Sequence, residues 1–108
     1  HVDCVQAPGK IINWMNLTFG DIWTFSGHKF GSLKGVGFTF LNSRVPFHPM
    51  ITGGGQQSAL RSGTENPMGV QSVSLALQDL EHVDVLGLSH LREKLVTYLQ
   101  SELKGIGE

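Results

Sequence analysis

The stretch SGHKFGSLKGVG, residues 26–37, places a histidine and a lysine side by side in a segment that holds four glycines. The runs DIWTFS (21–26) and GVGFTFLN (35–42) flank it, and both are rich in the β-branched and aromatic residues that favour strands. Both runs are apolar at nearly every position, a pattern typical of strands covered on both faces. The sequence therefore predicts two buried strands joined by a glycine-rich loop that presents His28 and Lys29.

The other segments before residue 66 indicate short strands and turns. Residues 1–5 predict the end of a strand, and APGK (7–10) predicts a turn, because proline fixes φ and glycine relaxes it. INWMNLTF (12–19) has room for one helical turn. TGGGQQSALRSGTEN (52–66) is a long polar loop whose three successive glycines allow the backbone to approach another surface closely.

The part of the chain after residue 66 predicts two amphipathic helices. Asn66 is a favourable N-cap, and Pro67 suits the first helical position, where its missing N–H costs nothing. The predicted apolar stripe of the first helix consists of Val70, Val73, Leu77 and Leu80. A second helix is predicted from about Ser89 to Lys104, ending before Gly105, with an apolar face made of Leu88, Leu91, Leu95, Leu99 and Leu103. These apolar faces are larger than a three-stranded sheet covers, which favours further packing partners.

Length and composition favour one small globular domain. The chain has 108 residues, of which 40% are hydrophobic and 16% charged. Its net charge of −1 gives no electrostatic case for binding nucleic acid or an anionic membrane, and no apolar run approaches the roughly 20 residues of a membrane span. A single cysteine forms no internal disulfide, so we expect a reducing compartment, most simply the cytoplasm. Because the chain opens without methionine, on what reads as a strand already under way, we also expect a piece of a larger protein.

The position of Lys29 suggests covalent chemistry with a carbonyl compound. A lysine amine becomes a nucleophile when it is desolvated or set near another cation, and its typical product is a Schiff base, as with pyridoxal phosphate. A pyridoxal phosphate site also needs a carboxylate for the pyridine nitrogen, and hydroxyl, imidazole or N–H groups for the phosphate. Asp3, Ser26 and His28 supply these groups at strand ends, where open α/β sheets bind ligands. A solvated Lys29 beside a structural His28 is the competing interpretation of the same residues.

Three ordered motifs decide between these interpretations. HVDCVQAPGK, FSGHKFGSLKGVGF and ITGGGQQSALRSGTEN resemble the cysteine desulfurase branch of the class V aminotransferase family, whose patterns are VDA-Q--GK, SGHK-(Y/F)G-PKG-G and GGGQE-G-RSGTEN. The match covers about residues 1–69. The resemblance implies an α/β fold, namely a fragment of the large domain of a fold type I transferase dependent on pyridoxal phosphate. Residues 1–65 would provide strands and cofactor loops, and 66–108 the helices leading toward the C-terminal domain.

The resemblance also implies a role for each matched site residue. Lys29 would form the Schiff base with pyridoxal phosphate and serve as the catalytic residue. Asp3 would pair with the pyridinium nitrogen, and Gln6 would hydrogen-bond the 3′ oxygen of the cofactor. Ser26 and His28 would hold the phosphate. No metal ligand is implied.

Further implications concern partners and reaction. Thr64 would reach the phosphate of the neighbouring subunit in a homodimer, and Gly53, Gly54 and Gly55 would line that partner's active site. The implied enzyme converts L-cysteine to L-alanine, passes sulfur to an enzyme cysteine as a persulfide, and then gives it to a sulfur-acceptor protein for iron–sulfur cluster assembly or thiolation. Selenocysteine lyase, another class V enzyme, and an inactive truncated chain that only binds a partner are the alternatives.

The chain departs from the family patterns at a few positions. The departures are Cys4 for a small residue such as alanine, Ser32-Leu33 for a proline-containing pair, and Gln57 for glutamate. We interpret Cys4 as a small buried hydrophobe, because the family's nucleophilic cysteine lies far C-terminal to these motifs, as does its carboxylate-binding arginine. The remaining charged residues are interpreted as solvated surface, including Lys10, Lys34 and Arg44.

Overall fold

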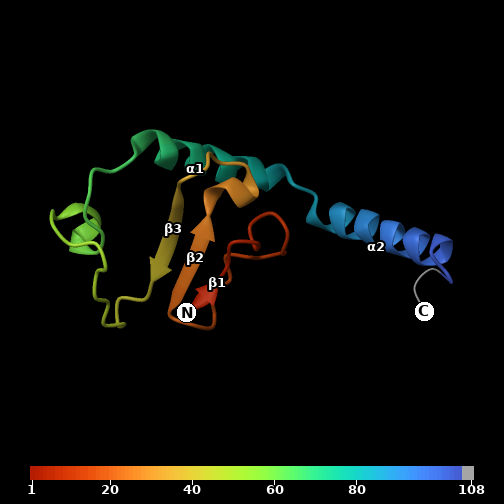
Figure 1. The fold of residues 1–108 in the computed structure, drawn as a ribbon, viewed down its shortest axis with the longest axis horizontal. Coiled ribbons are helices and arrows are strands. Elements are labelled where there is room, and N and C mark those ends of the chain that lie inside the picture. The colour runs from red at the N-terminus through yellow and green to blue at the C-terminus, as the bar shows by residue number, and fades with distance from the viewer. Residues whose placement is uncertain (106–108) are drawn as a thin grey trace.

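The computed structural model describes residues 1–105 and contains a three-stranded sheet in the order β1-β2-β3 (Figure 1). β1 (Val2–Asp3) pairs parallel with β2 (Ile22–Ser26), and β3 (Gly37–Leu41) pairs antiparallel with β2. All three predicted strands are therefore present. The chain is an α/β unit in which β2, the strand that leads into the His28–Lys29 loop, lies in the middle of the sheet.

The core is centred on β2. Trp23 and Phe25 are buried, and the Phe25 ring stacks on Phe38 of β3 with ring centroids 4.6 Å apart. Trp14 meets the Phe25 ring edge-on at 5.5 Å. β3 is less covered, and Phe40 is 38% exposed. The prediction that both strands are covered on both faces is thus wrong within residues 1–105, because β3 is the edge strand and only one face of β2 is fully buried.

The first helix follows the prediction in position, and three of the four residues of the predicted stripe lie near its packing face. α1 (Pro67–Asp79) begins at the predicted N-cap, where the Asn66 side chain accepts a hydrogen bond from Gly69 N at 3.0 Å. Its buried residues are Gly69 and Ala76, whereas Val70 of the predicted stripe is 60% exposed. Val73, Leu77 and Leu80 of the stripe are half-buried, and the fully buried positions hold small residues: a Cβ added to Gly69 would lie 3.1 Å from Val36 Cβ.

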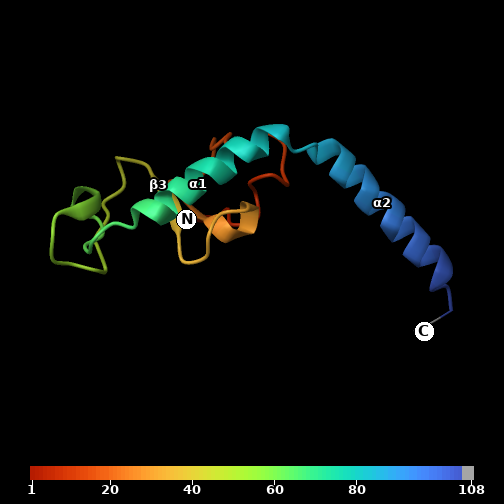
Figure 2. The ribbon, with the colours of Figure 1, turned by 90° about the horizontal axis from the view of Figure 1, so that it is seen from above.

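The second helix starts earlier than predicted and leaves the body of the molecule. α2 (Val85–Glu102) begins after Asp84, whose carboxylate accepts from Gly87 N at 2.9 Å, and it ends two residues before the predicted end. A short 3₁₀ turn (Leu80–His82) separates it from α1, and α2 then projects away from the sheet (Figures 1 and 2). Its predicted apolar face is exposed throughout the described part of the chain, at Leu88, Leu91, Leu95, Leu99 and Leu103.

The remaining segments form turns and loops. Residues 12–19 contain turns and no helix, because Asn13 adopts a left-handed φ of 55° that interrupts any helical turn. The polar loop 52–66 stands apart from the sheet in both ribbon views (Figures 1 and 2). Among residues 1–105, neither helix has the length and apolar character that a membrane crossing requires.

Candidate active site at the carboxyl end of β1 and β2

Parallel pairing of β1 and β2 brings the predicted acid and amine to one edge of the sheet. Asp3, the last residue of β1, is in register with Thr24, and Cys4 N donates to Thr24 O at 2.9 Å. Ser26 is the last residue of β2. Because the two strands run in the same direction, Asp3 and Ser26 lie at the same end, as the sequence predicted.

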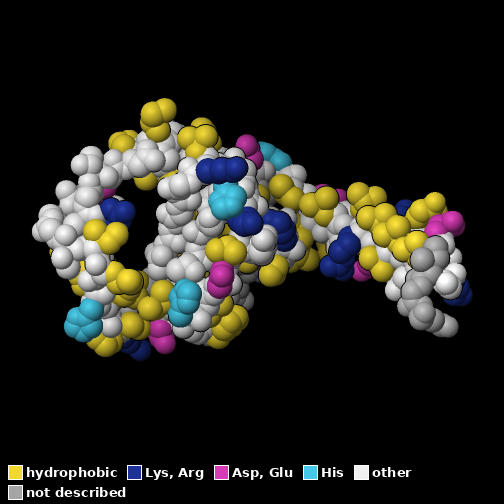
Figure 3. All heavy atoms as spheres, in the orientation of Figure 1, with side chains coloured by type: hydrophobic (Ala, Val, Ile, Leu, Met, Phe, Trp, Pro, Cys, Tyr) yellow, Lys and Arg dark blue, Asp and Glu magenta, His cyan; other side chains and the backbone are white. Residues whose placement is uncertain are grey.

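The residues after β2 form a 3₁₀ turn, η1 (Gly27–Phe30), that presents two polar side chains. Gly27 and Phe30 are buried, while His28 and Lys29 between them are exposed. Ser26 Oγ lies 3.1 Å from His28 Nδ1 and orients the imidazole ring. The buried ends of the turn therefore fix the backbone that carries the imidazole and the amine. Figure 3 shows histidine and lysine or arginine side chains gathered over this end of β2.

Backbone contacts close the loop that follows η1. Gly27 N donates to Val36 O at 3.0 Å, and Ser32 N donates to Gly27 O at 3.1 Å. Gly31 adopts a φ of 103°, which few other residues tolerate. A Cβ on Gly37 would lie 2.4 Å from Phe25 O, so glycine is required where β3 begins. The glycines of the loop thus serve to fold the chain tightly around the Lys29 turn.

A hydroxyl pair that the sequence analysis missed ties this loop to α1. Ser32 Oγ and Ser72 Oγ are 2.7 Å apart, and Ser72 Oγ also lies within hydrogen-bond distance of Gly69 O, at 2.7 Å. Leu33 N donates to Ser72 Oγ at 3.3 Å. Ser32, the first residue of the pair that replaces the family's proline-containing pair, therefore has a structural partner in α1. The feature of the sequence that could have indicated this contact is Ser72, which lies on the packed face of α1 four residues before the small residue Ala76.

The end of β1 and the turn after it carry the other predicted site residues at this edge of the sheet. Asp3 Oδ1 accepts from Val5 N at 3.0 Å, and Gln6 is exposed beside a buried Pro8. Lys10, which the sequence analysis interpreted as solvated surface, donates from Nζ to Lys29 O at 2.8 Å. Lys10 is exposed, as predicted, but its contact with Lys29 was not predicted; parallel pairing of β1 and β2 places the two loops next to each other. Lys10, the lysine that ends the first motif, was the feature of the sequence that could have indicated this contact.

Thr64 and the three glycines lie elsewhere in the molecule. They belong to the loop that stands apart from the sheet, and Thr64 is exposed. The loop is held by its own contacts: buried Ser62 donates from Oγ to Gly54 O at 2.8 Å, and Gln57 Nε2 donates to Glu65 Oε1 at 2.6 Å. The described chain thus does not bring Thr64 to Lys29, and the predicted role of Thr64 across a dimer stays a prediction.

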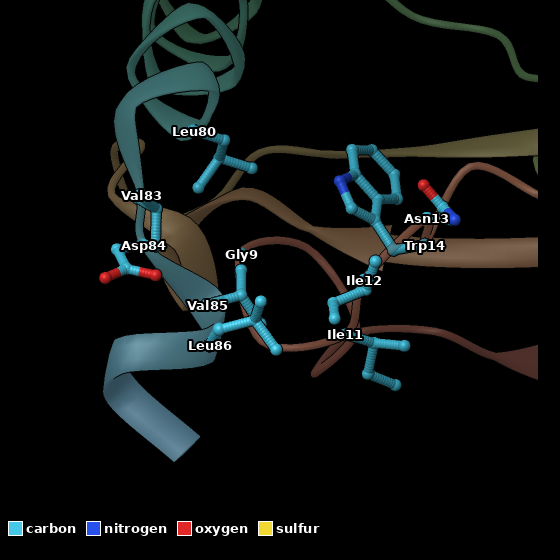
Figure 4. Close-up of a pocket in the computed structure, with 10 residues that line it drawn as sticks. All are labelled: Gly9, Ile11, Ile12, Asn13, Trp14, Leu80, Val83, Asp84, Val85 and Leu86. Atoms are coloured by element: carbon cyan, nitrogen blue, oxygen red, sulfur yellow. The ribbon is translucent and has the colours of Figure 1, made fainter. Parts of the chain in front are cut away.

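An apolar cavity of about 380 Å³ is lined by residues other than the predicted site residues (Figure 4). It opens between the turn after β1 and the junction of α1 with α2. Asp84 is its only charged lining residue; the others are Gly9, Ile11, Ile12, Asn13, Trp14, Leu80, Val83, Val85 and Leu86. The cavity therefore offers apolar contact but none of the predicted cofactor ligands. Residues 1–105 also contain no cluster of three or more His, Cys, Asp or Glu side chains suited to a metal ion.

The donor set at the sheet edge fits pyridoxal phosphate. One carboxylate, one amide, one hydroxyl–imidazole pair and one exposed amine come from two parallel strands and the turns that follow them. These are the groups that the ring nitrogen, the ring oxygen, the phosphate and the aldehyde of that cofactor require. Fold and donor set are thus compatible with a segment of a protein that binds pyridoxal phosphate.

Comparisons with known proteins agree with this class. The family model for class-V aminotransferases matches residues 1–108, and the chain belongs to that family. A cysteine desulfurase of Nostoc sp. is 36% identical over 106 residues, which are 95% of this chain and 26% of that protein. A cysteine desulfurase of Cereibacter sphaeroides is 44% identical over 78 residues, covering 72% of this chain and 20% of the relative.

Solved structures show the same fold. A NifS-like protein superposes with a TM-score of 0.82 at 39% identity, covering 99% of this chain and 29% of that one. A NifS-like protein from Rickettsia africae gives a TM-score of 0.78 at 35% identity, covering 92% and 28%. The chain is therefore part of a fold type I large domain, and it spans about a quarter of the length of the curated relatives it matches.

Proposed function

We propose that this chain supplies the cofactor-binding edge of a cysteine desulfurase dependent on pyridoxal phosphate. The observation that carries the proposal is the placement of Lys29 on a fixed turn at the same sheet edge as Asp3, in a chain 36% identical to a cysteine desulfurase over 95% of its length. In the whole protein, L-cysteine and an enzyme cysteine thiol would give L-alanine and an enzyme persulfide. A sulfur-acceptor protein would then take the terminal sulfur.

Each residue of the edge has a task in this proposal. When bound, the cofactor supplies an electron sink for the substrate carbon atoms. Lys29 Nζ binds the cofactor covalently and later takes up and returns a proton. The Asp3 carboxylate keeps the ring nitrogen protonated, and Gln6 bonds the ring oxygen. Ser26 and His28 bind the phosphate, with the 3.1 Å contact between them setting the direction of the imidazole.

The separate loop supports a homodimeric arrangement in this proposal. Gly53, Gly54, Gly55 and Thr64 lie on a projecting loop that is closed by the buried Ser62 hydroxyl rather than by the sheet. Gln57, Ser58 and Ala59 all have positive φ, so this backbone adopts a conformation that only its own contacts maintain. A loop built in this way can enter a neighbouring subunit without rearranging, and there Thr64 would bond the phosphate.

We expect the 108-residue chain by itself to release no alanine from L-cysteine in the presence of pyridoxal phosphate. Lys29 and His28 are exposed, and the described residues exclude no water from the edge where the reaction would occur. Amino-acid analysis of the purified chain after incubation measures this. Alanine and sulfide formation by the isolated chain, lost in Lys29→Ala, would contradict the expectation.

The same assay on the whole protein that contains this segment tests the proposed reaction. Alanine formed from L-cysteine in stoichiometric amounts with persulfide sulfur supports cysteine desulfurase. Turnover of L-selenocysteine with none of L-cysteine would identify selenocysteine lyase instead. No turnover of either amino acid, together with retained partner binding, would favour the inactive alternative.

Substitution of Ser26 by alanine is expected to weaken binding of pyridoxal phosphate roughly fivefold to tenfold, because a hydrogen bond to a charged phosphate and the support of His28 are both lost. Binding of pyridoxal, which lacks the phosphate, should not change. Absorbance titrations of the wild-type chain and the variant measure both affinities, with Ser43→Ala as the control in an exposed turn. An equal loss for the two ligands would remove Ser26 from the phosphate site.

A further inference from the structure

Lys10 makes a long-range contact with the turn that carries Lys29. Its Nζ donates to Lys29 O at 2.8 Å, across 19 positions of sequence. The backbone that carries Lys10 is itself fixed, because Lys10 N and Ile11 N both donate to Ala7 O at 3.1 Å and the neighbouring Pro8 is fully buried. The ammonium group therefore reaches the Lys29 carbonyl from a firmly held turn.

The carbonyl that Lys10 contacts lies at the end of η1. Carbonyl groups in the last turn of a helical segment have no partner within the helix, and a lysine side chain near that end is favourable for them. η1 is only one turn long, with buried Gly27 and Phe30 as its backbone supports. The hydrogen bond from Lys10 to Lys29 O therefore supports the backbone of Lys29, the residue whose amine must point toward the cofactor.

The contact also joins the two halves of the candidate site. Lys10 belongs to the turns that follow β1, the strand that ends at Asp3, and Lys29 belongs to the turn after β2. β1 has only two residues, so its pairing with β2 by itself fixes this turn weakly. The hydrogen bond from Lys10 to Lys29 O adds a second link between the turn after β1 and the turn after β2, besides the pairing of the strands.

We propose that Lys10 is a positioning residue for Lys29, holding the cofactor lysine at a fixed distance from the acid end of the site. This inference rests on the proposed function of Lys29. It assigns a task to the first motif's lysine, which touches neither the reacting atoms nor the cofactor. Lys34, which lies in the same loop as Lys29 and is exposed with no hydrogen bond or ion pair recorded in the described structure, offers a matched control.

Three variants of the 108-residue chain test the proposal: Lys10→Met, which keeps the apolar stem, Lys10→Arg, which keeps a charged donor, and Lys34→Met as the control. The first readout needs no cofactor. It is the carbonyl ¹³C resonance of Lys29, which moves upfield when the carbonyl loses a hydrogen bond. We expect the shift in Lys10→Met, its reversal in Lys10→Arg, and no shift in Lys34→Met.

The second readout is the ratio of borohydride-fixed pyridoxal phosphate at Lys29 to that at Lys94, an exposed lysine of α2. We expect Lys10→Met to lower this ratio about threefold to tenfold, in line with the loss of one hydrogen bond from a charged donor. Lys10→Arg should restore it to within about twofold, because the arginine keeps a charged donor.

Three outcomes overturn the proposal. The first is that neither the labelling ratio nor the Lys29 carbonyl resonance changes in Lys10→Met. The second is that the resonance moves while the labelling ratio stays the same. The third is that labelling falls equally at Lys29 and Lys94 together with the unfolding midpoint, which indicates that Lys10 supports the fold in general. A wild-type chain without any preference for Lys29 overturns the proposed function itself. The carbonyl resonance then still decides whether Lys10 holds the turn.

Discussion

Lys29→Ala is expected to abolish the visible absorption that the chain develops when it binds pyridoxal phosphate covalently. Lys29 lies on a fixed turn at the same sheet edge as Asp3, and alanine at this position cannot form the bond. An absorbance titration at constant protein concentration measures the loss. We expect more than about 90% of the specific signal to disappear, leaving only slow reaction at the exposed lysines.

The matched control for this experiment is Lys34→Ala. Lys34 lies five residues from Lys29 in the same loop and is equally exposed. Its removal should leave the titration unchanged, because it has no partner at the sheet edge. Equal losses in the two variants would mean that the cofactor reacts with loop lysines in general, and the assignment of Lys29 would then fail.

Phe25→Ala should destabilise the chain by about 3–5 kcal/mol, the usual cost of removing a buried aromatic ring. Phe25 is 4% exposed and contacts the rings of Trp14, Phe38 and Phe40. A domain of this size has a total stability of only about 5–10 kcal/mol, so most of the folding free energy would be lost. Urea unfolding followed by tryptophan fluorescence gives the change.

Phe19→Ala removes the same atoms from an exposed position and serves as the comparison. The Phe19 side chain is 67% exposed, and its backbone carbonyl, which accepts from Trp23 Nε1, is retained. We expect a change of no more than about 0.5 kcal/mol. A chain in which the two substitutions have the same effect would not have the aromatic core described above.

The strands and the start of α1 could be predicted because local chemistry determines them. The β-branched and aromatic runs around residues 26–37 became β2 and β3, and the Asn66-Pro67 pair opened α1 at the predicted residue. The start of α2 was missed because Asp84 acts as its N-cap although the apolar pattern is weak there. The capping hydrogen bond thus starts α2 four residues before the position that the apolar periodicity indicated.

Apolar spacing indicated the general packing side of α1 but not its closest contacts. Val73, Leu77 and Leu80 of the predicted stripe are half-buried, whereas the fully buried residues are the small Gly69 and Ala76. Close approach of a helix to a tight loop requires small side chains at the contact, and Ala76 Cβ lies 4.0 Å from where a Cβ on Gly31 would be. Which small residues make these contacts depends on the fold of the loop, which helical periodicity does not encode.

The residue types of the site could be predicted from the sequence, but the residues that hold its loops in place could not. Asp3, Ser26 and Lys29 were predicted to lie at strand ends, where open α/β sheets bind ligands, and the parallel pairing of β1 with β2 brings these strand ends to one edge. Lys10 and Ser72 were missed because each acts through a contact between segments distant in sequence. The role of Thr64 depends on a second subunit and stays a prediction.

The most direct test is a map of where pyridoxal phosphate attaches to the wild-type chain. The cofactor is added, fixed by borohydride reduction, and located by peptide mass spectrometry among the five lysines, which are Lys10, Lys29, Lys34, Lys94 and Lys104. The placement of Lys29 on a fixed turn at the same sheet edge as Asp3 predicts that most of the label lies on Lys29. Label spread evenly over the five lysines would contradict the assignment of this sheet edge as the cofactor site.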